Sequence, residues 1–96
     1  MYFIYILTNV SNKVMYVGVT NDLRRRITEH KQGLCADNSF TKRYRVTKLV
    51  YFESFPDPQT AIRREKQLKH WAREKKDNLV SDFNSNSEDL FNKLPL

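Results

Sequence analysis

The stretch YFIYILT at residues 2–8, with VMYVGVT at residues 14–20, decides the fold. Both runs are rich in Tyr, Phe, Ile and Val, which favour strands, and the five residues between them are typical of a turn. The pair therefore predicts a β-hairpin. Packing alone gives no reason for Tyr5, Tyr16 or the glycine Gly18 on two such short strands. These three residues are therefore candidates for a functional role.

Helical and strand patterns alternate after the hairpin. Thr20 or Asn21 is expected to cap a helix that ends near Gly33, and a polar loop is expected over 34–45. A third strand is predicted over 46–55.

The dipeptide Asp57–Pro58 is typical of a helix start, with proline at the first helical position. Helical patterns then continue to about residue 71 and again over 73–83. The order ββα–β–αα predicts an α+β fold, in which a small three-stranded mixed or antiparallel sheet is flanked by helices. We expect one domain over 1–83 and a short tail or irregular cap over 84–96.

The net charge and the cysteine content limit the partners and the kinds of site that the protein can have. The 96 residues carry a net charge of +6, and the sequence pI is about 9.6. A basic surface of this kind suits a polyanion such as DNA or RNA, although it also serves solubility. The single cysteine, Cys35, excludes an internal disulfide and a cysteine-based zinc site. We expect no membrane span, no secretory leader and a cytoplasmic location.

One carboxylate occupies an unusual place in the helix predicted after Pro58. At 100° per residue, Glu65 falls on the same stripe as Ala61, Leu68 and Ala72, which is the face expected to cover the sheet. Burying a carboxylate is costly unless it has a partner. Lys69, four residues on, could supply that partner as a purely structural pair. The alternative is that Glu65 has a functional role.

The first predicted helix also has polar residues beside its apolar stripe. Arg26 and His30 flank its apolar stripe, whereas Arg24 and Arg25 are expected to project away from it. Such residues are often no more than boundary or snorkelling side chains. Together with two tyrosines and one carboxylate, however, they supply what phosphodiester hydrolysis needs. An arginine can bind phosphate, a Tyr or His can activate water, and a carboxylate can hold one divalent cation.

The same residues resemble a known family. The spacing FIY (3–5), YVG (16–18), DLRRRITEH (22–30) and the glutamate of AIRREKQLK (61–69) is similar to the GIY-YIG nuclease superfamily. Within it, the chain looks most like small stand-alone bacterial proteins related to the N-terminal catalytic domain of the excinuclease C subunit. The resemblance covers roughly residues 2–91.

The resemblance implies a role for each matching residue. Tyr5 and Tyr16 would be the motif tyrosines, and Gly18 would let the backbone pass close to the site. Arg26 would stabilise the phosphate, and either Tyr16 or His30 would be the general base. Glu65 corresponds to the metal ligand of the family and would hold Mg²⁺ or Mn²⁺. Asn84 corresponds to the family's C-terminal asparagine.

These residues predict an Mg²⁺- or Mn²⁺-dependent endonuclease that hydrolyses DNA by a one-metal mechanism, with no small-molecule cofactor. Two alternatives stay open: a nucleic-acid-binding module of the same fold with little or no activity, and a small protein-interaction domain. Trp71 is interpreted as a packing residue rather than a base-stacking platform. Candidate contacts to the nucleic acid are Arg25, Lys42, Arg43 and Lys69.

Overall fold

The computed structural model describes residues 1–33 and 43–94, so Cys35 and Lys42 lie outside the described part of the chain. Its core is an antiparallel sheet in the order β2–β1–β3, formed by β1 (Tyr2–Thr8), β2 (Met15–Thr20) and β3 (Lys48–Phe55). The predicted α+β class and three-stranded sheet are confirmed, and the pairing is antiparallel rather than mixed. No helix in the described ranges has the length and apolar character that crossing a membrane requires.

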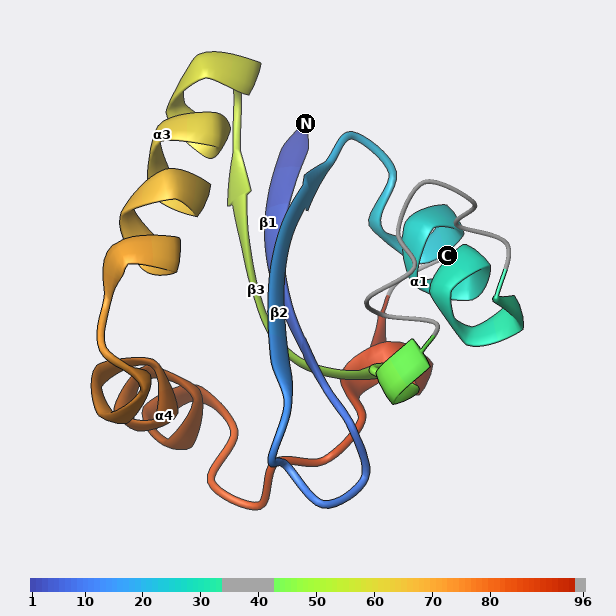
Figure 1. Ribbon diagram of the computed structural model, residues 1–96. Helices are drawn as coiled ribbons and strands as arrows, with labels where there is room; N and C mark the ends of the chain where they lie inside the picture. Colours follow the sequence, from blue (N-terminus) through green and yellow to red (C-terminus); the bar gives the residue numbers. More distant parts are fainter. Residues whose placement is uncertain (34–42, 95–96) are drawn as a thin grey trace.

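Helices lie on both faces of the sheet (Figure 1). One face is covered by α3 (Pro58–His70) and α4 (Arg73–Phe83), and the other by α1 (Leu23–Gln32) and the short 3₁₀ helix η1 (Leu90–Lys93). Since helices cover both sides of the sheet, both faces of the central strand β1 are buried. Ile4 and Ile6 pack toward α3, whereas Tyr5 and Leu7 pack toward α1. This strand alternation places Tyr5 beneath α1.

The start of α1 differs from the sequence prediction. The N-cap is Asp22 rather than Thr20 or Asn21, because its carboxylate accepts a hydrogen bond from the Arg25 N–H. Thr20 instead supports this cap, since its hydroxyl oxygen accepts from the Asp22 N–H at 3.1 Å. The helix ends as predicted at Gly33, whose φ of 70° is the left-handed conformation that favours glycine.

The break between α3 and α4 corrects the predicted apolar stripe. Ala61 and Leu68 are fully buried against the sheet. Ala72 is exposed, because α3 ends at His70 and the backbone is extended at Trp71 and Ala72. Trp71 packs beside the core, with Arg64 and Lys75 over its ring, in agreement with its interpretation as a packing residue.

The predicted start of α3 at Pro58 is confirmed, and its cap leads to a pH prediction. Hydrogen bonds from the Thr60 hydroxyl and backbone N–H to Asp57 hold the pKa of that carboxyl below its ordinary value. The stabilisation is therefore present above the unfolded-state pKa and is lost as the pH falls through the lower folded-state pKa.

We expect acidification from about pH 5 to about pH 3 to lower the urea midpoint more in the wild type than in Asp57→Asn. Asparagine keeps the capping geometry but does not titrate. Asp82→Asn, at an exposed position in α4, is the matched control and should keep the wild-type pH dependence. An identical pH dependence in wild type and Asp57→Asn would contradict this account of the cap.

Candidate active site

Tyr5 and Gly18 form the floor of the candidate site. The two residues are paired across β1 and β2, and the Tyr5 ring lies over the glycine. A β-carbon on Gly18 would stand 2.4 Å from the Tyr5 hydroxyl oxygen and 2.5 Å from its Cζ. The absence of a β-carbon at Gly18 therefore lets the backbone of β2 lie directly against the Tyr5 phenol.

Three rings meet above this floor. The Tyr5 hydroxyl and His30 Nε2 are hydrogen-bonded at 3.1 Å. The ring centroids of Tyr5 and Tyr16 are 6.3 Å apart, and His30 stands 5.8 Å from each. Tyr5 and His30 are 2% and 4% exposed, whereas Tyr16 is only half-buried. Of the three, Tyr16 is thus the side chain most accessible from outside.

The position of Arg26 follows from the helical repeat of α1. Leu23, Ile27 and His30 face the sheet, and Arg26 lies one turn before His30 on the same flank of the helix. Its Nη1 is 3.7 Å from a Glu29 carboxylate oxygen, and its side chain is partly exposed. An arginine is thereby placed at the rim of the Tyr5–Tyr16–His30 cluster.

Arg24 and Arg25, which precede Arg26 in α1, differ in exposure and in contacts. Arg25 projects into solvent, with 72% of its side chain exposed. Arg24 does not project away as predicted. It donates a hydrogen bond to the Leu94 carbonyl at 2.9 Å and its guanidinium lies over the Phe91 ring. The reason is that the C-terminal segment folds against this flank of α1, a contact that the helical period cannot indicate.

Glu65 lies on the opposite face of the sheet from the ring cluster, because its helix is α3. Ala61 and Leu68 face the sheet, Arg64 reaches Glu53 on β3, and Glu65 is about 100° further round the helix axis. In the order β2–β1–β3, this flank of α3 is turned toward β2. Glu65 and the rings therefore approach the β2 edge from opposite faces.

The Glu65 carboxylate has a partner on its own helix. Lys69 Nζ lies 2.8 Å from Glu65 Oε2, and only 13% of the Glu65 side chain is exposed. This is the purely structural pair that the sequence allowed. It also means that Lys69, a candidate contact to nucleic acid, is engaged by Glu65.

The described residues offer few side chains that could bind a divalent cation. Within residues 1–33 and 43–94, no three His, Cys, Asp or Glu side chains gather into a preformed metal cage. A single carboxylate suits Mg²⁺ or Mn²⁺, since such ions keep several waters and take oxygens from a bound phosphate. Glu65 could therefore be the single protein ligand of such an ion, with water and phosphate oxygens as its other ligands.

Asn84 lies at β3, which is the strand on the far side of β1 from β2. Its amide donates to the Val50 carbonyl at 3.2 Å and to the Glu88 carbonyl at 2.8 Å, and its Oδ1 accepts from the Glu88 N–H. Asn84 therefore fastens the C-terminal segment to the sheet and takes no part in the ring cluster. The remaining candidate Arg43 is exposed and lies over the Tyr44 ring.

Asn84→Ala is expected to lower the free energy of unfolding by about 2 kcal/mol, because it leaves the Val50 carbonyl and the Glu88 N–H without this partner. Urea denaturation measures the change. Asn92→Ala removes an exposed amide of the same segment and should cost much less. Equal effects of the two substitutions would show that the Asn84 bonds contribute no particular stability.

Two polar groups of the structure have no specific signal in the sequence. Asp89 caps η1, accepts from the Leu49 N–H and pairs with Lys31, so it joins β3, η1 and α1. On the other face, Arg64 forms an ion pair with Glu53 on β3.

The same polar group includes a buried tyrosine. Burial raises the pKa of Tyr51 to about 12, and the Glu53 carboxylate, which accepts from its hydroxyl, adds to the rise. The sequence offers only an aromatic residue two positions before a glutamate on a strand, and this pattern is too common to be specific.

The chain is similar to a known protein family over the residues of this candidate site. The family model of the GIY-YIG catalytic domain matches residues 1–78, a range that includes the ring cluster, Arg26 and Glu65. The chain belongs to the GIY-YIG family. GIY-YIG domains form a nuclease superfamily, so a nucleic acid is the general class of substrate. Asn84 lies beyond the matched range.

The GIY-YIG assignment agrees with the chain's relatives. It is 35% identical to a UPF0213 protein of Haloquadratum walsbyi, over 84% of this chain and 88% of the relative. A UPF0213 protein of Clostridium perfringens is 37% identical, over 84% of each chain. The solution NMR structure of a UPF0213 protein from Bacillus halodurans shares 36% identity and a TM-score of 0.52, over 84% of each chain.

Proposed function

We propose that this GIY-YIG protein is a metal-dependent endonuclease that nicks DNA by a one-metal mechanism. The observation that carries the proposal is the Tyr5–Tyr16–His30 cluster with Arg26 at its rim. A packing role does not require two phenols and an imidazole in mutual contact, and Arg26, one turn before His30, would bind a phosphate beside them. In this proposal DNA passes along the β2 edge.

Each side chain then has a distinct task. Arg26 binds the scissile phosphate and stabilises the charge that develops on it. The half-buried Tyr16 orients or deprotonates the attacking water, and His30 holds the Tyr5 hydroxyl in place. Glu65 would anchor Mg²⁺ or Mn²⁺, which when bound neutralises phosphate charge and lowers the pKa of water.

The basic surface of α3 supports DNA as the substrate. Glu65 and Lys69 lie toward β2, and the exposed outer face of α3 continues round the helix with Lys66, His70 and Arg63. Cations in this arrangement suit a phosphate backbone, and their contribution falls as salt rises. The net charge of +6 adds to the same attraction.

A second candidate is a nucleic-acid-binding module with the same fold and little or no catalysis. The Glu65–Lys69 ion pair favours it, because a carboxylate engaged by lysine is a weaker ligand for a cation. The two candidates differ in one measurable respect. Both bind DNA with a steep salt dependence, but only the endonuclease converts supercoiled plasmid to nicked circles in Mn²⁺ and stops when the ion is chelated.

Arg26→Ala should reduce the nicking rate at saturating protein by about a hundredfold, because phosphate charge loses its stabilising partner. Arg25→Ala is the matched comparison on the exposed side of the same helix. It should weaken DNA binding two- to threefold, as about one phosphate contact is lost, and leave the saturated rate unchanged. Equal loss of rate in both variants would contradict a special role for Arg26.

A further inference from the structure

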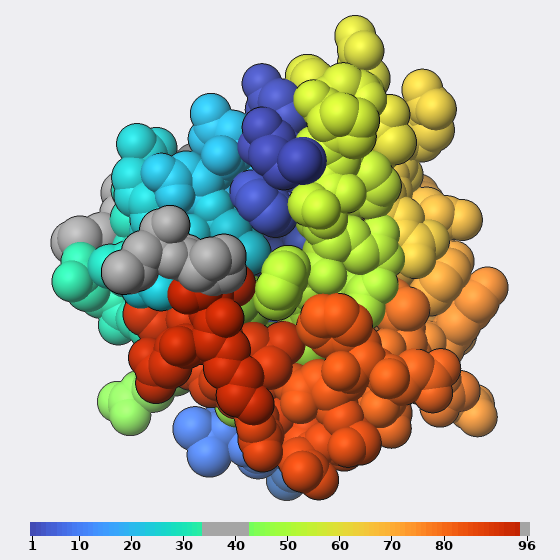
Figure 2. Space-filling view, turned by 180° about the vertical axis from the view of Figure 1, so that it is seen from behind, coloured from blue at the N-terminus to red at the C-terminus, as the bar shows by residue number. Residues whose placement is uncertain are grey.

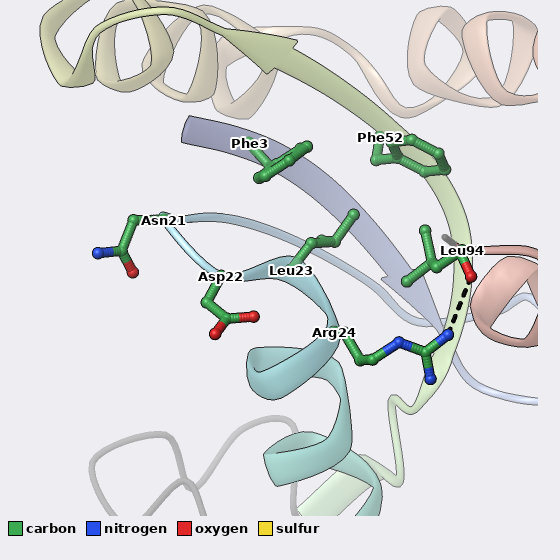
Figure 3. Close-up of a pocket in the computed structure, with 7 residues that line it drawn as sticks. All are labelled: Phe3, Asn21, Asp22, Leu23, Arg24, Phe52 and Leu94. Atoms are coloured by element: carbon green, nitrogen blue, oxygen red, sulfur yellow. Dashed lines mark hydrogen bonds between the residues drawn. The ribbon is translucent and has the colours of Figure 1, made fainter. Parts of the chain in front are cut away.

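The C-terminal segment, residues 84–94, is attached to α1 near both ends of the helix. Near the start of α1, Arg24 Nη2 donates to the Leu94 carbonyl at 2.9 Å. Figure 3 draws this bond as a dashed line, beside the cavity that the two residues line. Near the end of α1, Lys31 forms an ion pair with Asp89. Figure 2 looks onto this side of the molecule, with the end of the described chain (red) next to α1 (cyan).

One aromatic ring connects these two attachments. The Phe91 ring centroid lies 5.1 Å from the Arg24 guanidinium carbon and 5.2 Å from Lys31 Nζ. At such distances a cation is attracted to the face of an aromatic ring. Because residues 24 and 31 are about 10 Å apart along the helix axis, this single ring bridges the flank between them. We call Asp89, Phe91 and Leu94 the clasp.

The clasp is itself fixed to the sheet. The Asp89 carboxylate accepts from the Leu49 N–H of β3 at 3.2 Å. Leu94 is a buried member of the apolar cluster beneath α1. Lys31 Nζ also donates to the Thr47 carbonyl at 3.0 Å, just before β3 begins. One flank of α1 is therefore tied to β3.

The site residues of α1 lie on its other flank. Measured at 100° per residue from the fully buried Ile27, Arg24 and Lys31 lie about 40–60° to one side. Arg26 and His30 lie about 60–100° to the other side. A roll of α1 by about 20° would displace groups at the helix surface, about 5 Å from the axis, by about 2 Å. The contacts to the clasp and the two site residues therefore move together when the helix turns about its axis.

The clasp restrains this roll in a way that apolar packing does not. Leu23 and Ile27 hold α1 to the sheet, but the hydrophobic effect has no preferred direction. The clasp adds directional contacts, namely a hydrogen bond at one end of α1 and an ion pair at the other. A catalytic group has to be held within about 0.5 Å of its productive position, which is less than the displacement that such a roll produces.

We propose that the clasp is a positioning element, which fixes the roll of α1 and thereby places Arg26 and His30 beside the two tyrosines. The inference deepens the proposed function and rests on it, since these positions set the rate of nicking. It gives a role to residues 89–94, which lie beyond the range 1–78 that the family model matches. The clasp acts through α1 and not on the nucleic acid. Its loss should therefore lower the rate of the bound complex and leave the affinity for DNA unchanged.

Two variants loosen the clasp without deleting a cation. Phe91→Leu removes the ring between Arg24 and Lys31. Asp89→Asn removes the charge that pairs with Lys31 and keeps an acceptor for the Leu49 N–H. Each should lower the nicking rate at saturating protein about tenfold, because a misplacement of about 1 Å is costly to catalysis. The half-saturating protein concentration should change less than about twofold, since every cation that could contact phosphate is kept.

A measurement that does not depend on nicking uses the two histidines of the chain, His30 and His70. In both variants the NMR signals of the His30 imidazole should shift, because the imidazole moves relative to the Tyr5 ring. His70, which is exposed at the end of α3, is the internal reference. Asp89→Asn deletes no aromatic ring, so a shift in this variant cannot come from the lost ring current of Phe91.

Two further variants are controls. Phe91→Tyr keeps the ring and should keep both the wild-type rate and the His30 signals. Val80→Ala shortens a buried side chain of α4 on the opposite face of the sheet, so it lowers stability without touching α1. It should also keep the rate, and unfolding midpoints establish that all variants are folded in the assay. An equal loss of rate in Val80→Ala and Phe91→Leu, or a loss without a shift of the His30 signals, would overturn the positioning role.

The two proposals fail in different ways. If the wild type nicks DNA and Phe91→Leu nicks at the same saturated rate, the clasp proposal is overturned and the endonuclease stands. If the wild type does not nick DNA, the endonuclease fails and the His30 signals decide on the clasp. A shift in Phe91→Leu and Asp89→Asn that is absent from Phe91→Tyr then supports it, and unshifted signals overturn it.

Discussion

Gly18→Ala is expected to lower the free energy of unfolding by about 3 kcal/mol. The new β-carbon would stand 2.4 Å from the Tyr5 hydroxyl oxygen and 3.0 Å from Tyr16 Cε2. Tyr5 cannot swing away freely, because its ring is almost completely buried and its hydroxyl is bonded to His30. Urea denaturation of the purified variant measures the loss.

Substitutions of Tyr5 in the Gly18→Ala background test whether the loss of stability comes from a clash with the Tyr5 ring or from alanine at this position of β2 in general. Tyr5→Phe should not rescue Gly18→Ala, since Cζ of the ring would still stand 2.5 Å from the new carbon. Tyr5→Leu should rescue it, so that the double variant is at least about 1 kcal/mol more stable than the sum of the two single losses predicts. Strict additivity of Gly18→Ala and Tyr5→Leu would exclude direct overcrowding.

Glu65→Ala is expected to have the largest effect on activity, lowering the rate of plasmid nicking in Mn²⁺ at least a hundredfold. The physical reason is that the described residues form no group of three or more His, Cys, Asp or Glu side chains, so the ion would depend strongly on this one carboxylate. Glu74→Ala, at an exposed position in α4, is the matched control and should nick at the wild-type rate.

The structural alternative for Glu65 makes a different prediction. If the carboxylate serves only to pair with Lys69, then Glu65→Ala and Lys69→Ala should give the same small loss of stability, within about 1 kcal/mol, and neither should change the saturated nicking rate. If Glu65 is the metal ligand, Lys69→Ala keeps the saturated rate while Glu65→Ala abolishes it. Measured at saturating Mn²⁺ and protein, the pair of variants decides between the two roles.

The sequence predicts those features that depend on local periodicity. The hairpin, the sheet-facing residues of α1 and the start of α3 at Pro58 all follow from patterns within a few residues. The position of Arg26 beside His30 follows from the helical repeat in the same way. These parts of the candidate site lie on one helix and one hairpin, so the sequence brings them close together without knowledge of the tertiary structure.

Contacts between distant segments could not be predicted in this way. Asn84 and Asp89 bond to Val50 and Leu49, which lie 34 and 40 residues earlier, and no periodic pattern connects them. The inward turn of Arg24 depends on Leu94 in the same manner. The fit of the Tyr5 ring over Gly18 is likewise a property of strand register, since it requires that these two residues pair directly.

The anchoring of residues 84–94 along β3 makes the two margins of the sheet unequal. The Asn84 amide donates to the Val50 carbonyl and the Asp89 carboxylate accepts from the Leu49 N–H, whereas β2 at the other margin has no strand beyond it in the described chain. Addition of a further strand is therefore hindered at this part of β3. Two copies joined through their β2 edges would close on each other as a pair rather than extend into a polymer.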